Sequence, residues 1–213
     1  MQKKDHRKEC VAGVIVAAGL SSRMGRFKPL LPIGNTTFVK RIIHTMRKAG
    51  VDEIVVVGGA HFSELSDHLL IENVRLLCNE AYESTQMFAS FQIALGATEH
   101  ADAILFTPVD IVLPDVEVYR GLLASDVSFD CVRPSYEGKS GHPVLIRKRL
   151  FPALLSYSGD GGLKAALQGA GAVNAWVNVQ EPGILMDADT PEDYRRILSY
   201  DAKDQLSEPS GRY

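Results

Sequence analysis

Short runs of β-branched residues alternate along this chain with segments of helical periodicity, and this alternation restricts the fold more than any other feature. A strand at residues 14–16 is followed, after a loop, by a helix that ends at Gly50. The apolar side chains that share one face of that helix are Phe38, Ile42, Met46 and Ala49. Repetition of this unit predicts a parallel sheet with right-handed crossovers and helices on both faces.

The unit recurs up to residue 123, and then the pattern changes. Two apolar runs, 129–132 and 144–146, flank the polar segment 135–142, which predicts a hairpin or mixed-sheet insertion. We therefore expect a three-layer α/β fold with a mostly parallel, Rossmann-like sheet and a mixed-sheet insertion. The other expected strands are 54–57, 74–77, 103–106 and 173–179, and the other expected helices are 61–70, 87–95, 114–123, 163–167 and 191–198.

The same pattern predicts how the chain is divided. We expect an N-terminal extension at 1–10, a single domain at 11–200 and a disordered tail at 201–213, because the tail has no apolar periodicity. The charged start and the apolar run after it superficially resemble a signal peptide. Asp5 and Glu9 interrupt the positive region, and the run makes better sense as a first buried strand.

Charge and cysteine content exclude several classes of partner. The 213 residues include 23 lysines and arginines against 26 aspartates and glutamates, so neither nucleic acid nor an anionic membrane is an expected partner. No apolar run approaches the roughly 20 residues that cross a bilayer. Cys10, Cys78 and Cys131 have no metal-binding or redox spacing, which favours reduced thiols in a cytoplasmic protein.

The loop that follows the first expected strand, residues 17–32, has the composition of an anion site. Its glycines let backbone amides approach a phosphate, and it carries three cations, Arg23, Arg26 and Lys28. Its spacing matches neither a P-loop nor a dinucleotide fingerprint. On residue types alone, a phosphate loop and a flexible surface loop remain equally open interpretations.

Three aspartates are candidate metal ligands. Asp110 comes directly after the buried strand 103–106, where an aspartate is also a common turn residue. Asp187 and Asp189 lie in an alternating, strand-like stretch that would point both carboxylates to one side. Such oxygens suit Mg²⁺. The residues after them form a helix start in which Thr190 is the N-cap, so they need no catalytic explanation.

The spacing Ala-Ala-Gly-x-Ser-x-Arg-Met-Gly-x-x-Lys-x-Leu-Leu-Pro at 17–32 resembles the opening motif of nucleotidyltransferases that act on sugar phosphates, isoprenoid precursors and molybdopterin. Further segments resemble that group in the expected order, at 108–114, 141–145, 159–163 and 187–193. The chain is most similar to the molybdenum cofactor cytidylyltransferase family. Ala18 stands where the related guanylyltransferases have a second glycine, which favours CTP over GTP. Gln86 departs from the family's glycine.

The resemblance implies a nucleotide-diphospho-sugar transferase type of fold and a set of residue roles. Arg23 and Lys28 would stabilise the departing phosphates, and Asp110 with Asp189 or Asp187 would hold Mg²⁺. His142 and Ser90 would contact the acceptor. The residues implied to hold the nucleotide are Ala17, Ala18, Gly19, Leu20, Ser21, Ser22, Arg23 and Lys28.

The reaction implied is transfer of CMP from CTP to molybdopterin with release of pyrophosphate. A phosphate oxygen of the acceptor would attack the α-phosphorus, so no protein nucleophile is required. The product is a cofactor form used by molybdenum hydroxylases, which makes such an enzyme an expected partner. Two alternatives stay open: a nucleotidyltransferase for a sugar or polyol phosphate, and a non-catalytic protein that binds and delivers molybdopterin.

Overall fold

The computed structural model describes residues 9–51 and 53–207. It has an eight-stranded sheet in the order β10-β7-β9-β6-β1-β4-β5, with β8 paired to β7. Within it, only β9 and β8 run antiparallel to their neighbours. The strands are β1 (Val11–Ala17), β4 (Glu53–Gly58), β5 (Arg75–Cys78), β6 (Ala103–Pro108), β7 (Cys131–Tyr136), β8 (Lys139–Ser140), β9 (Val144–Arg147) and β10 (Asn174–Asn178).

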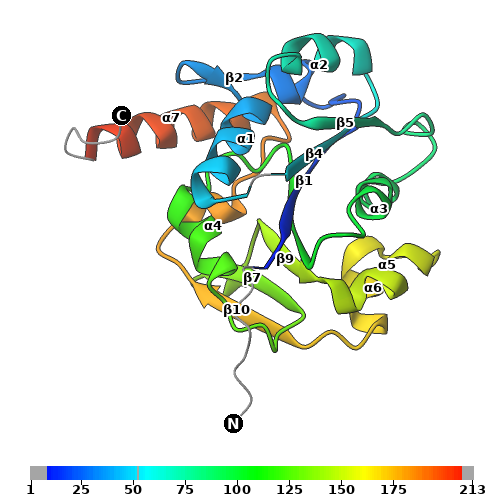
Figure 1. Cartoon of the computed structure of the whole chain (residues 1–213). Coiled ribbons are helices and arrows are strands. Elements are labelled where there is room, and N and C mark those ends of the chain that lie inside the picture. Colours follow the sequence, from blue (N-terminus) through cyan, green and yellow to red (C-terminus); the bar gives the residue numbers. More distant parts are fainter. Residues whose placement is uncertain (1–8, 52, 208–213) are drawn as a thin grey trace.

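Helices cover both faces of the sheet, which confirms the predicted three-layer α/β class (Figure 1). The helices are α1 (Phe38–Ala49), α2 (Phe62–Leu69), α3 (Met87–Ala97), α4 (Val116–Leu123), α5 (Phe151–Ser156), α6 (Gly162–Gly169) and α7 (Pro191–Ser207). The short elements are the 3-10 turns η1 (Lys28–Leu30), η2 (Lys148–Leu150) and η3 (Pro182–Leu185), and the small hairpin of β2 (Pro32–Ile33) and β3 (Thr36–Thr37).

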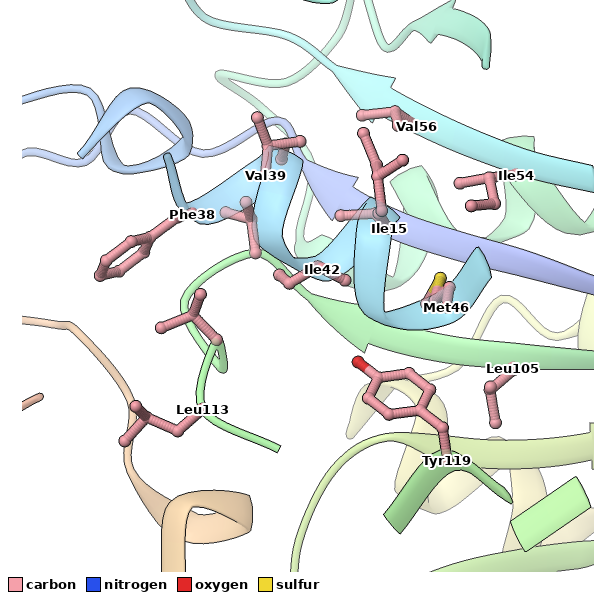
Figure 2. Packing of buried hydrophobic residues seen from close by; sticks show 14 of the residues in the cluster. Ile15, Phe38, Val39, Ile42, Met46, Ile54, Val56, Leu105, Leu113 and Tyr119 are labelled. Carbon is pink, nitrogen blue, oxygen red and sulfur yellow. The ribbon is translucent and has the colours of Figure 1, made fainter. Parts of the chain in front are cut away.

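The core has two halves, one on each face of the sheet. On the first face, side chains of α1 and α4 pack against the strands, and Figure 2 shows Ile42 and Met46 of α1 with Ile15 and Leu105 of the sheet and Tyr119 of α4. Each of these is almost fully buried, and such burial contributes about 2 kcal/mol for an aliphatic side chain. On the second face, α3, α5 and α6 cover the sheet.

Several predicted elements agree with the structure in detail. The helix α1 begins at Phe38 and ends at Gly50, whose φ of 98° is left-handed and therefore suits glycine. The apolar run that begins at residue 11 forms the buried strand β1. The insertion also exists, because β7 pairs with β9 in antiparallel register, with Cys131 opposite Ile146.

Three expectations were wrong. The helix expected from 114 begins at Val116, because Asp115 is its N-cap and accepts a hydrogen bond from the amide of Val118. A helix that the sequence did not predict, α5, follows β9. The last helix, α7, continues to Ser207, so the tail does not begin at 201 as expected; its remaining residues, 208–213, lie outside the described part, as do residues 1–8 of the expected extension.

Candidate active site

The site lies where two central strands end side by side. The strands β1 and β6 pair in parallel, with Val16 opposite Pro108, and the amide of Val109 donates to the carbonyl of Val16. The loop after β1 and Asp110 after β6 are therefore neighbours at the carboxyl edge of the sheet. This is the edge where open parallel sheets bind their ligands.

The loop after β1 is held in one shape by its own hydrogen bonds. Ser21 adopts a left-handed φ of 53°, and its carbonyl accepts hydrogen bonds from the amides of Met24 and Gly25. Its hydroxyl accepts from the amide of Lys28 at 3.1 Å. Met24 is buried and anchors the loop to the core. The tight turn between residues 21 and 25 delivers Lys28 to the edge of the sheet.

Glycine occupies position 19 in the loop and position 59 beside it, and the physical reason differs between the two. A methyl group at Gly59 would lie 2.7 Å from the carbonyl oxygen of Ala18 and from Cβ of Tyr82, so glycine is required there for packing. A methyl group at Gly19 would meet no atom within 4 Å, and Gly19 has no left-handed φ. Neither packing nor backbone conformation therefore requires glycine at position 19. A glycine in such open space is expected where a ligand closely approaches the backbone.

A pocket of about 160 Å³ opens at this loop. Of the residues expected to hold a nucleotide, those that line it are Ala17, Ala18, Gly19, Ser21 and Lys28, together with Asp110. Leu20, Ser22 and Arg23 do not line it and are exposed. The sequence also missed Tyr82 and Thr85, which line the pocket from the segment before α3.

Lys28 joins two of the three candidate metal ligands. Its Nζ lies 3.1 Å from Oδ2 of Asp110 and 2.7 Å from Oδ1 of Asp189. Burial by itself would lower the pKa of Lys28, but the hydrogen bonds and charges of Asp189 and Asp110 outweigh it and raise that pKa. Arg23 also contacts Asp189, with its Nη2 2.8 Å from Oδ2. These cations hold the pKa of Asp189 below its ordinary value, mainly through the Lys28 hydrogen bond.

Asp187 joins the same cluster through the backbone. The amide of Ala188 donates to the carbonyl of Asp110, which ties the segment before α7 to the end of β6. The stretch 187–189 is not part of a sheet strand, but Ala188 is buried between the more exposed Asp187 and Asp189. Partial burial, and then the charges of Asp189 and Asp110, raise the pKa of Asp187. Three carboxylates thus gather here.

The donor chemistry of this cluster fits a hard divalent cation, since such ions take carboxylate oxygens. Within residues 9–51 and 53–207, however, no three carboxylate, imidazole or thiol groups already form a cation cage. Lys28 and Arg23 supply the compensating positive charge instead. The roles of Asp110, Asp187 and Asp189 as metal ligands stay predictions.

A second, larger cavity of about 920 Å³ adjoins the first. It lies on the sheet face that α3 and α6 cover, and its walls include residues of β6, β7, β9 and β10. Gln86 and Met87, at the start of α3, line both spaces. The residue at which the chain departs from the family's glycine is therefore at the boundary between them.

The structure places the two expected acceptor contacts in different spaces. His142 lines the large cavity, where its ring meets the Phe106 ring edge-on, with 5.5 Å between the ring centroids. Ser90 lines the small pocket and is buried, and its Oγ accepts a hydrogen bond from Nδ2 of Asn79 at 2.9 Å. Both roles remain predictions.

His142 has a polar atom without a partner. Its Nδ1 is buried and makes no hydrogen bond, which is uncommon for a buried polar group and points to a ligand. Burial lowers the pKa of His142 to about 4. The imidazole is therefore neutral near pH 7 and offers one donor and one acceptor.

Three cavity residues were missed at the sequence level: Arg133, Lys164 and Trp176. The sequence holds a signal for one of them, Trp176. In the strand β10, Asn174, Trp176 and Asn178 alternate with Ala175 and Val177, and the chain's one tryptophan falls on the more exposed side. An exposed tryptophan on an alternating strand favours a binding surface.

A glycine-containing loop, a lysine and a carboxylate at the carboxyl edge of a mostly parallel sheet define a nucleotide-binding α/β protein. The sequence profile of the MobA-like NTP transferase domain matches residues 13–175. The chain belongs to this family and is a nucleotidyltransferase of the MobA-like kind.

Relatives of known name extend over nearly the whole chain. It is 30% identical over 198 residues to the nicotine blue oxidoreductase of Paenarthrobacter nicotinovorans, a match that covers 89% of this chain and 97% of the relative. It is 27% identical over 186 residues to the molybdenum cofactor cytidylyltransferase of Escherichia coli (strain K12), with 85% and 92% covered.

Solved structures confirm the fold. Rv0371c from Mycobacterium tuberculosis H37Rv, in complex with manganese, superposes with a TM-score of 0.72 at 23% identity, and the match covers 89% of this chain and 98% of that one.

In residues 9–51 and 53–207, no helix has both the length and the apolar character needed to span a bilayer.

Proposed function

We propose that this chain transfers CMP from CTP to the phosphate of molybdopterin and releases pyrophosphate. The observation that carries the proposal is the pair of adjoining spaces that share Gln86 and Met87. One has the loop, Lys28 and Asp110 expected of a triphosphate site, and the other has the volume for a second substrate. The Escherichia coli molybdenum cofactor cytidylyltransferase relative supports CTP and this acceptor, and Ala18 favours CTP over GTP.

The chemistry proposed is an in-line displacement. An oxygen of the acceptor phosphate forms a bond to the α-phosphorus of CTP, the bond from that phosphorus to the bridging oxygen of the β-phosphate breaks, and pyrophosphate leaves with the electron pair. Because the attacking oxygen is already anionic, the protein has to align the two phosphates and neutralise charge. No side chain has to act as a nucleophile.

Lys28 is the main cation for this task. Its side chain is only 13% exposed and is tethered at the pocket wall, where loss of the surrounding water strengthens its attraction for phosphate oxygens. It would exchange part of its contact with Asp110 and Asp189 for the β- and γ-phosphates. Arg23, whose side chain is 72% exposed, would add a weaker contribution from the rim.

Asp110 and Asp189, with Asp187 beside them, are the residues that would hold Mg²⁺. When bound, the ion would neutralise the triphosphate and polarise its phosphoryl oxygens. The manganese in the related Rv0371c structure supports a divalent ion at this fold. We further propose a cytoplasmic enzyme that delivers its product to a molybdenum hydroxylase.

The experiment is a matrix of CTP, GTP, UTP and ATP against molybdopterin, ribose 5-phosphate and ribitol 5-phosphate, with Mg²⁺, in which pyrophosphate is measured. Release that requires CTP and molybdopterin supports the proposal. Release with a sugar or polyol phosphate alone identifies the other nucleotidyltransferase class. Binding of molybdopterin without nucleotide and without turnover identifies the delivery protein.

A second candidate function is reduction of a flat aromatic compound in the large cavity. The observation that favours it is the 30% identity to the nicotine blue oxidoreductase over 97% of that relative. The loop lacks the dinucleotide fingerprint, which speaks against a nicotinamide site of the usual kind. Consumption of NADH or NADPH in the presence of an aromatic acceptor, without pyrophosphate release, would establish this candidate in place of the first.

A further inference from the structure

The wall of the large cavity has a one-sided charge. It includes Arg133 and Lys164, and none of the residues that line it in the described part of the chain is an aspartate or glutamate. The chain as a whole has more acidic than basic residues, so this local excess of positive charge is not a consequence of composition. A cavity of this kind favours a ligand with at least one negative charge.

The cavity is also unusually aromatic. Phe88, Phe91 and Phe106 form a continuous group. Phe88 stacks on Phe91 with 5.8 Å between the ring centroids, and Phe91 meets Phe106 edge-on with 5.0 Å between the centroids. Trp176, on β10, also lines the cavity and is 55% exposed. Aromatic faces bind flat ring systems better than they bind flexible polyols, because stacking buries a large area at little cost in conformational entropy.

Trp176 and Arg133 face the cavity together because of strand register. The strand β10 pairs with β7 in parallel, with Trp176 opposite Arg133. Side chains that are opposite in a parallel pair point to the same face of the sheet. Cys131, two residues before Arg133, belongs to the core half under α3, α5 and α6, which identifies that face as the cavity side. An aromatic plane and a guanidinium are thus neighbours on one wall.

The orientation of both side chains is restrained. The indole Nε1 of Trp176 donates a hydrogen bond of 2.7 Å to Oγ of Ser140, on the short strand β8. One guanidinium nitrogen of Arg133 donates to Oδ1 of Asn174 at 3.2 Å, which leaves other N–H groups of its fork available. Restrained side chains lose less entropy when a ligand binds.

The beginning of α6 adds to the positive wall. Its N-cap is Gly161, which makes no side-chain capping hydrogen bond, and Gly162 and Lys164 line the cavity. The first amides of a helix carry a partial positive charge when no side chain caps them. This end of α6 and Arg133 both favour an anionic group inside the cavity.

We propose that Trp176 and Arg133 select the acceptor: Trp176 stacks on a planar heteroaromatic ring, and Arg133, with Lys164, pairs with an acidic substituent of that ring. The inference rests on the proposed function, in which the large cavity holds the acceptor. It assigns the choice between a flat anionic ring and a sugar or polyol phosphate to these two side chains.

The first test uses the fact that the chain has one tryptophan, so its fluorescence reports on this wall directly. With CTP and Mg²⁺ present to fill the small pocket, the emission is titrated with pterin-6-carboxylate, with unsubstituted pterin and with ribose 5-phosphate. We expect saturable quenching by pterin-6-carboxylate, at least about tenfold weaker binding of pterin, and no response to the sugar phosphate. Equal responses to pterin-6-carboxylate and ribose 5-phosphate would overturn the proposal.

The second test compares variants by calorimetric titration and by acceptor kinetics. Trp176→Leu is expected to weaken pterin-6-carboxylate binding about tenfold, while Trp176→Phe restores most of the affinity. Arg133→Met is expected to weaken pterin-6-carboxylate about tenfold and unsubstituted pterin hardly at all. The matched control is Arg120→Met, because Arg120 is an exposed arginine of α4 that pairs with Glu117 outside both spaces.

The two proposals fail in different ways. If no acceptor gives pyrophosphate but the variants still show this pattern of pterin binding, the proposed reaction is wrong and the recognition site stands. If molybdopterin is turned over and Trp176→Leu and Arg133→Met leave both its KM and its preference over ribitol 5-phosphate unchanged, the reaction stands and the assignment of these residues is wrong. Unchanged circular dichroism in each variant shows that the fold is retained.

Discussion

The Nζ of Lys28 lies 2.7 Å from Oδ1 of Asp189, across 161 positions of sequence. The contact joins the loop after the first strand to the segment before the last helix, and Asp110, 3.1 Å from the same nitrogen, joins both to the middle of the chain. A single lysine thus connects three segments at one edge of the sheet. A bound triphosphate would compete with Asp110 and Asp189 for the positive charge of Lys28.

Removal of the Lys28 ammonium should reduce turnover strongly. For Lys28→Met we expect kcat to fall by about 10²- to 10³-fold, the usual effect of losing one preorganised charge at a developing anion. Pyrophosphate release at saturating CTP and acceptor measures it. Lys48→Met is the matched control, because Lys48 is an exposed lysine of α1 that lines neither space. Equal loss in both variants would contradict the assigned role.

Arg23→Met should have a smaller effect than Lys28→Met. The side chain of Arg23 is 72% exposed, so solvent and salt screen its charge. We expect about a tenfold loss in kcat/KM for CTP, which shrinks further as ionic strength rises. A loss as large as that of Lys28→Met, independent of salt, would show that Arg23 moves into the pocket.

Gly19→Ala separates ligand approach from packing. Because a methyl group at Gly19 meets no atom within 4 Å, the melting temperature should stay within about 1 °C of that of the unmodified chain. Binding of CTP should weaken about tenfold or more, since the methyl group stands where phosphate would approach the backbone. Thermal shift with and without CTP measures both effects.

Gly59→Ala is the counterpart for that experiment. Its methyl group would lie 2.7 Å from the carbonyl oxygen of Ala18, so we expect a loss of about 2 kcal/mol in the free energy of unfolding. If Gly19→Ala lowers the melting temperature as much as Gly59→Ala does, then glycine at position 19 serves packing and not the ligand.

His142 should act without changing its protonation state. Its pKa of about 4 keeps the imidazole neutral between about pH 5.5 and 8, so KM for the acceptor should show no histidine-like step in that range. His142→Phe retains the ring contact with Phe106 but removes both nitrogens. We expect KM for the acceptor to rise several-fold, with little change in KM for CTP. A step near pH 6.5 that vanishes in this variant would disprove a neutral role.

Asp130 should govern the stability of the protein in acid. It is buried, pairs with Arg149, and accepts a hydrogen bond of 2.8 Å from the amide of Val173. The Arg149 hydrogen bond, foremost, holds the pKa of Asp130 below its ordinary 3.8. Since the pKa is lower in the folded state, this contribution is complete above the unfolded-state pKa and disappears as pH falls through the folded-state value.

Asp130→Asn tests that prediction. We expect it to cost about 2 kcal/mol of unfolding free energy at pH 7, measured by urea denaturation, and to cost progressively less below about pH 4. Asp67→Asn, an exposed aspartate of α2, is the control. If Asp130→Asn lowered the unfolding free energy by the same amount at pH 7 and at pH 3, the proposed link between the pKa of Asp130 and stability would be contradicted.

Much of the architecture was predictable because it depends on local patterns. The apolar face of α1 and its stop at Gly50, the continuous apolar strand β6 and the capping of α7 by Thr190 all follow from neighbouring residues, and the structure confirms each. The errors have equally local causes. Asp115 is a better N-cap than Pro114 is a first helical residue, and α7 continues because nothing at 201 stops a helix.

The candidate site was predictable only in part. The loop at 17–32 and Asp110 stand out because each directly follows a buried strand. Trp176, Arg133 and Lys164 do not, since Arg133 and Trp176 meet through the pairing of β7 with β10, and Lys164 reaches the same cavity from α6. Non-local pairing of this kind has no signature in the spacing of residues along the chain.

Sequence alone determined the class of fold and the residue types of the loop at 17–32, because helical and strand periodicity and turn chemistry act over a few residues. Tertiary structure decided which charges meet. Lys28 faces Asp110 and Asp189 instead of standing alone, and Asp187 joins them through the backbone of Ala188. It also placed an aromatic and cationic wall beside the loop. These contacts arise from strand order, which is set by burial summed over the whole sheet.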